Sequence, residues 1–186
     1  MGGFLIAFLK YYANLAFSML PLSERIIQRI GPYEPVTVKD VRASGVKLSE
    51  WAVKLLRRKR RESDWRGNFV LGNLVNLLDP APEVRADGKY VPDKFNDEEV
   101  LRKLGLGLCL PHDALFLRLN WDKHKDYPDR LVRVGMKPVQ TSKRPHDFPK
   151  ILVLEKMADE TLGISHSSCH PNLRFTGDFW WIFREL

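Results

Sequence analysis

Two short groups of cysteine and histidine hold the side chains best suited to chemistry in this 186-residue chain. Cys109 and His112 are separated by two residues, and so are His166 and Cys169. Such pairs bind structural zinc in a tetrahedral arrangement, because both ends of a short turn can reach one ion. Together the four residues would supply a zinc site with two sulfur and two nitrogen ligands. We favour the interpretation that they are ordinary loop residues, because short cysteine and histidine coincidences are frequent, and we expect no cofactor; the zinc site is the alternative.

Catalytic motifs are missing around these groups. Ser167, Ser168, Cys169 and His170 supply a nucleophile and a base, but no strand-turn-helix elbow or paired base surrounds them. No phosphate-binding glycine loop is present elsewhere in the chain. We therefore expect a non-catalytic protein, and a small metal-dependent enzyme is the alternative that a zinc site would favour.

Positive charge is concentrated in the first part of the chain. The protein has 30 Lys and Arg against 23 Asp and Glu, and residues 1–80 hold 13 of the basic and 7 of the acidic residues. One cluster contributes much of this excess, and its members are Lys54, Arg57, Arg58, Lys59, Arg60 and Arg61. Phosphates of rRNA, anionic lipid headgroups and an acidic subunit surface all suit such a cluster. A solvated helix end is the reading that needs no partner.

The N-terminal segment is apolar and aromatic. Residues 2–20 have one charge, and as a helix they would measure roughly 28 Å, close to the hydrocarbon thickness of a bilayer. We favour a single membrane-spanning helix, and a helix in the headgroup region or a buried core helix are the alternatives. The side chains expected to contact the membrane are Phe4, Phe8, Tyr12 and Leu15. Arg25 and Arg29 then favour a body on the positive-inside face, which is the matrix side for a mitochondrial protein.

The remaining pattern predicts a mainly α, extended and irregular fold. We divide the chain into an apolar membrane-contact helix at 1–21, a basic helical unit at 22–79, a linker at 80–95 and a mixed irregular region at 96–186. Thr37 and Asp40 form a capping-box start for a short helix. Residues 47–61 and 69–78 are predicted as further helices, and residues 151–154 as a strand.

The chain ends in an aromatic arm. The side chains that make it apolar are Phe179, Trp180, Trp181 and Phe183. Such a segment would be an exposed apolar patch unless something covers it. We expect it to dock into a partner subunit, although packing on the chain's own core would also cover it.

The apolar N-terminal segment, the basic unit and the aromatic arm together are similar to lineage-specific accessory subunits of mitochondrial respiratory complexes or the ATP synthase. This resemblance implies a non-catalytic accessory subunit of a large complex in the mitochondrial inner membrane, with other subunits and lipids, cardiolipin included, as partners. Long irregular stretches agree with it, because such stretches are uncommon in a domain that folds alone. The alternative is a mitochondrial ribosomal protein that binds rRNA through the basic cluster.

Overall fold

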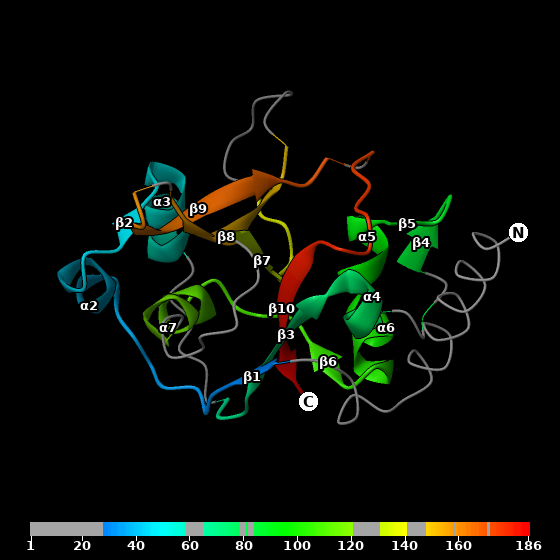
Figure 1. Ribbon diagram of the computed structural model, residues 1–186, viewed down its shortest axis with the longest axis horizontal. Coiled ribbons are helices and arrows are strands. Elements are labelled where there is room, and N and C mark those ends of the chain that lie inside the picture. The colour runs from blue at the N-terminus through cyan, green and yellow to red at the C-terminus, as the bar shows by residue number, and fades with distance from the viewer. Residues whose placement is uncertain are drawn as a thin grey trace, which may run out of the picture.

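The computed structural model describes residues 28–58, 65–78, 81, 84–120, 131–140, 148–157, 159–170 and 172–186. These residues form a mixed α/β fold around one large sheet (Figure 1). The prediction of a mainly α, extended and irregular chain is therefore wrong. Strands from the predicted 22–79 unit pair with strands from the predicted 96–186 region, so both ranges contribute to the same sheet.

The sheet has β10 near its centre. Its strands are β1 (Gln28–Ile30), β2 (Lys47–Leu48), β3 (Phe69–Asn73), β6 (Leu106–Gly107), β7 (Leu131–Val134), β8 (Lys150–Lys156), β9 (Leu162–Ser168) and β10 (Trp180–Glu185). Their order is β1-β3-β10-β7-β8-β9-β2. One edge of β10 pairs with β3 along its length, and β7 and β6 pair with successive parts of β10. A separate hairpin joins β4 (Arg85–Ala86) to β5 (Lys89–Tyr90).

Short helices surround the sheet. They are α2 (Val38–Ala43), α3 (Glu50–Arg58), α4 (Leu74–Leu78), α5 (Pro92–Phe95), α6 (Glu98–Lys103) and α7 (Asp113–Asn120). In Figure 1, α2, α3 and α7 gather toward the end of the sheet formed by β8, β9 and β2, whereas α4, α5 and α6 lie to the right of β10 and β3. The helix α7 packs against β8, β9 and α2.

The predicted helix at 69–78 shows why the fold class was misjudged. Its first half is β3, whose residues are almost all buried, and only its second half is helical. A short apolar run buried on both faces lacks the alternation that identifies a strand. The predicted strand at 151–154 is confirmed within β8, and the capping box between Thr37 and Asp40 is confirmed at the start of α2.

The membrane question concerns residues outside this description. Phe4, Phe8, Tyr12 and Leu15 all belong to the undescribed range 1–27. Among the residues that the structure does describe, no helix has the length and hydrophobicity needed to cross a bilayer.

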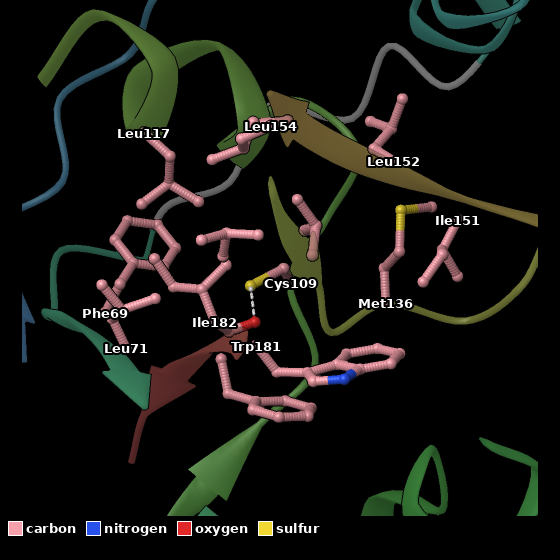
Figure 2. Packing of buried hydrophobic residues seen from close by; sticks show 14 of the residues in the cluster. Phe69, Leu71, Cys109, Leu117, Met136, Ile151, Leu152, Leu154, Trp181 and Ile182 are labelled. Carbon is pink, nitrogen blue, oxygen red and sulfur yellow. Dashed lines mark hydrogen bonds between the residues drawn. The ribbon is translucent and has the colours of Figure 1, made fainter. Parts of the chain in front are cut away.

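The aromatic arm is part of the chain's own core. Trp181, Ile182 and Phe183 of β10 are fully buried, and the Trp181 ring meets Phe95 and Phe175 edge-on at centroid distances of 4.8 and 5.4 Å. Figure 2 shows Trp181 and Ile182 among apolar side chains from several strands and from α7. The sheet thus covers the apolar surface that the sequence assigned to a partner.

Candidate ligand-binding pocket

A cavity of about 520 Å³ opens where β6 and the end of β10 meet two connecting segments. One segment runs from β6 to α7, and the other follows β7. Most of the lining is aliphatic, and the apolar residues are Leu106, Leu108, Leu110, Pro111, Met136, Val139 and Leu186. Trp65, Cys109 and the charged residues Glu98, Arg102, Lys137 and Arg184 complete it. The volume lies in the range of about 300–1,000 Å³ that is typical of small-molecule sites.

A buried ion pair holds one wall of this pocket. Arg184 Nε lies 2.7 Å from Asp113 Oδ2, and Arg184 Nη2 lies 2.9 Å from Oδ1, which makes the contact bidentate. The Asp113 side chain is fully buried and that of Arg184 is 12% exposed. The backbone N–H of Leu110 also donates to Asp113 Oδ2 at 2.8 Å. A bidentate contact of this kind fixes the orientation of both side chains as well as their separation.

Trp65 packs on the other side of the arginine. The Arg184 guanidinium carbon lies 4.7 Å from the centroid of the Trp65 ring, in a cation–π contact. The same indole meets Phe69 edge-on at 4.8 Å and Tyr33 at 6.0 Å. Trp65 contacts Arg184 and two further rings, and Arg184 also pairs with Asp113. The wall formed by Trp65, Arg184 and Asp113 is therefore preorganised.

Burial changes the acid–base behaviour of two groups at this wall. It raises the pKa of the Asp113 carboxyl, and the Arg184 guanidinium opposes part of that rise. Burial also raises the pKa of the Cys109 thiol well above its ordinary value, and the nearby Asp113 charge adds to the effect. Cys109 Sγ lies 3.6 Å from the carbonyl oxygen of Ile182 (Figure 2). The raised pKa of Cys109 favours the protonated thiol, which is a poor nucleophile.

The charged residues Glu98, Arg102 and Lys137 lie at the mouth of the pocket and differ in whether they form a salt bridge. Lys137 Nζ contacts Glu98 Oε1 at 2.7 Å, and this contact lowers the pKa of Glu98. Arg102 lies one helical turn after Glu98 on α6 and is exposed. Within the described part of the chain, Arg102 forms no salt bridge or side-chain hydrogen bond. Its charge contributes to lowering the pKa of Glu98.

The four zinc candidates do not come together. Cys109 is a buried residue of the pocket lining, and His112 directly precedes α7. His166 is exposed on β9, where its ring lies 5.1 Å from that of Trp51, and Cys169 is buried just beyond the same strand. All four are described, and no group of three or more His, Cys, Asp or Glu in the described ranges is arranged to hold a metal ion.

The basic cluster is described only in part. Lys54 and Arg57 are exposed on α3, and Lys54 Nζ contacts Glu50 Oε1 at 2.6 Å. Arg58 is the last residue of α3, and Lys59, Arg60 and Arg61 lie outside the described residues. A salt bridge within the helix therefore already engages one of the described cations.

The predicted docking residues all lie in or next to β10. Trp181 and Phe183 are fully buried, while Phe179 and Trp180 are partly buried against the core. Arg133 lies 4.4 Å from the Phe179 ring centroid, a contact that further ties this residue to the chain. At least Trp181 and Phe183 are thus inaccessible to a partner in the folded protein.

Sequence reasoning missed the residues that build the pocket. Asp113, Arg184, Trp65 and Arg102 were not among its candidates. One signal was present, because Arg184 directly follows the apolar run that ends at Phe183. A charged residue beside a buried strand needs a partner, and a buried carboxylate at the start of a nearby helix supplies it.

Comparisons of the chain with protein-family models, curated proteins and solved structures found no match.

Proposed function

We propose that this chain is a non-catalytic binding protein that receives the apolar part of a ligand in the pocket between β6, β10 and the segment after β7. One observation supports this most directly, namely an open cavity of about 520 Å³ with a largely aliphatic lining. Ligand sites combine such a lining with a few fixed polar groups. The Asp113–Arg184 pair, held against Trp65, provides a fixed polar wall.

The chemistry of the lining favours binding over catalysis. An acid–base catalyst works best with a pKa near the operating pH, and a thiol nucleophile needs a lowered pKa. Cys109 has the opposite shift, and Asp113 is fully buried against Arg184. Transfer of an alkyl chain from water to this lining supplies the driving force, at about 0.8 kcal/mol per buried methylene group.

The test uses the methionine methyl groups as reporters. Met136 lines the pocket and Met157 lies elsewhere, with its Cε beside Gly163. In the full chain with ¹³C-labelled methionine methyls, titration with 1-decanol should shift the Met136 signal saturably and leave the Met157 signal in place. A Leu108→Trp variant fills the pocket and should abolish the shift, and Val139→Phe serves if that variant misfolds. Equal shifts at both methionines, or none, would overturn the proposal.

A second candidate function is the accessory subunit of a mitochondrial membrane complex. The exposed Lys54 and Arg57 on α3 support it, together with the apolar sequence at 2–20. The described residues form a core of their own. Long irregular stretches in the sequence therefore no longer support this function. Resistance of the native protein to carbonate extraction, with migration in a large complex on a native gel, would support this function. Release from membranes together with RNA would favour the ribosomal alternative.

A further inference from the structure

We propose that the ligand of this pocket is an aliphatic monocarboxylate, whose head group binds Arg102 at the mouth and whose alkyl chain lies among the leucines and Met136. This inference rests on the proposed binding function and specifies its ligand. It follows from three features, which are the charge of Arg102, for which the described residues supply no salt-bridge partner, the aliphatic lining, and the contacts of Trp65 with the protein itself.

The charges at the mouth select an anion. Glu98 compensates Lys137 through their 2.7 Å contact, and the fully buried Asp113 compensates Arg184. Arg102 is the lining cation for which the described chain supplies no salt-bridge partner. A carboxylate can accept two parallel N–H bonds from a guanidinium, and this geometry is favourable for the planar fork of arginine. A cationic head group would instead meet Arg102 and Lys137.

The lining selects an alkyl chain over a planar ring. Trp65 is the aromatic residue of the lining, and the Arg184 guanidinium lies over its ring at 4.7 Å. The Trp65 and Phe69 rings also pack in a T-shape with their centroids 4.8 Å apart. A planar ligand would therefore have to compete with Arg184 and Phe69 for contact with the indole. Leucine and methionine side chains remain, and Met136 adapts well to an irregular apolar shape.

The experiment compares two probes that share a chain length and differ in charge. Decanoate and 1-decanol are titrated into the full protein near neutral pH, with the Met136 methyl shift as readout. Decanoate is kept below its critical micelle concentration and 1-decanol below its solubility limit. We expect decanoate to bind about twofold to fivefold more tightly, as one exposed charge pair allows. Added salt should weaken the binding of decanoate and leave that of decanol nearly unchanged.

Two charge reversals on the same helix isolate the role of Arg102. Arg102→Glu should remove the preference for decanoate while decanol still binds. Lys103→Glu changes the neighbouring exposed cation, which contacts Glu99 at 3.6 Å and does not line the pocket, and it should keep the preference. Arg102→Gln replaces the first variant if that variant fails to fold.

The outcomes separate this inference from the function on which it rests. Equal affinity for the two probes, or a decanoate preference that survives Arg102→Glu, would overturn the carboxylate assignment and leave the binding function standing. If neither probe shifts the Met136 signal, the binding function itself fails. A preference lost in both reversals would assign the effect to the general field of α6 and would also overturn the role of Arg102.

Discussion

Replacement of Arg184 by methionine tests whether the Asp113–Arg184 pair holds the pocket wall. The variant keeps most of the aliphatic volume but leaves a fully buried carboxylate without its cation. Removal of one partner of a buried ion pair costs about 3–5 kcal/mol. For a chain of this length, each kcal/mol lowers Tm by roughly 2–4 °C, so Tm should fall by roughly 6–20 °C.

Substitution of the other partner, Asp113, should lower the stability of the fold less than Arg184→Met does. Asp113→Asn leaves the Arg184 guanidinium, which is 12% exposed at the pocket and still contacts Trp65. The double variant, with Arg184→Met and Asp113→Asn together, leaves no unpaired charge. Its loss of stability should therefore be smaller than the sum of the losses in the two single variants. Lys47→Met provides the control, since Lys47 and Asp159 form a comparable pair at 3.4 Å with side chains 58% and 60% exposed. Loss of the Lys47–Asp159 pair should change the unfolding free energy by less than about 1 kcal/mol.

The decrease in the free energy of unfolding caused by Arg184→Met should also depend on pH. Burial raises the pKa of Asp113 and Arg184 opposes that rise, so its removal raises the pKa further. The folded variant then binds more protons than the unfolded chain between the ordinary carboxyl pKa of 3.8 and the raised value. The stabilisation that comes from this extra proton binding is complete below the ordinary pKa of the carboxyl. It is lost as pH rises through the raised pKa of Asp113 in the folded variant.

Urea unfolding followed by circular dichroism, at about pH 4.5 and about pH 7.5, measures the predicted difference. The deficit relative to the wild-type chain should be larger at the higher pH. A deficit no larger than that of Lys47→Met, or the same deficit at both pH values, would refute the reasoning that a buried, unpaired carboxylate is its cause.

Three further predictions concern other buried or capped positions. Cys109 and Cys169 are both buried, so a thiol reagent should label neither at neutral pH in the native protein and both after denaturation, as mass spectrometry would show; rapid native labelling of Cys109 would contradict its raised pKa. Thr37→Ala removes the cap of α2 and should cost about 1 kcal/mol in urea unfolding, whereas Thr37→Ser should retain most of the stability. Gly135→Ala places a methyl group 2.2 Å from the Phe183 ring and should cost about 1–3 kcal/mol, and an unchanged Tm would show that this contact relaxes freely.

The sequence allowed prediction of features that depend on near neighbours. Thr37 and Asp40 stand three residues apart, and their reciprocal hydrogen bonds form wherever that helix begins. The predicted helix at 47–61 contains α3, but Lys47 and Leu48 instead pair with β9. The pairing residues of β9 lie more than a hundred positions away in the chain, and no local pattern specifies that choice.

The centre of the sheet was unpredictable for the same reason. The segment at 179–183 is continuously apolar, which suits a free arm, a buried helix or a strand covered on both faces. What distinguishes them is the presence of β3 on one edge and of β7 and β6 on the other. Those strands come from three separate regions of the chain, so only their pairing shows that the arm is a central strand.

The pocket extends this argument from strands to single side chains. Asp113 and Arg184 are 71 residues apart, and Trp65 comes from a third region, yet pairing of β6 with β10 places Gly107 opposite Arg184 and so brings the start of α7 close to the arginine. Each residue alone suggests an ordinary surface charge or a core aromatic. A charge at the end of an apolar run is nevertheless informative, because a strand that buries Trp181 and Phe183 must also compensate the arginine that follows them. The search for a buried carboxylate near such an arginine identifies this wall, whereas the cysteine and histidine spacings identified residues that remain apart.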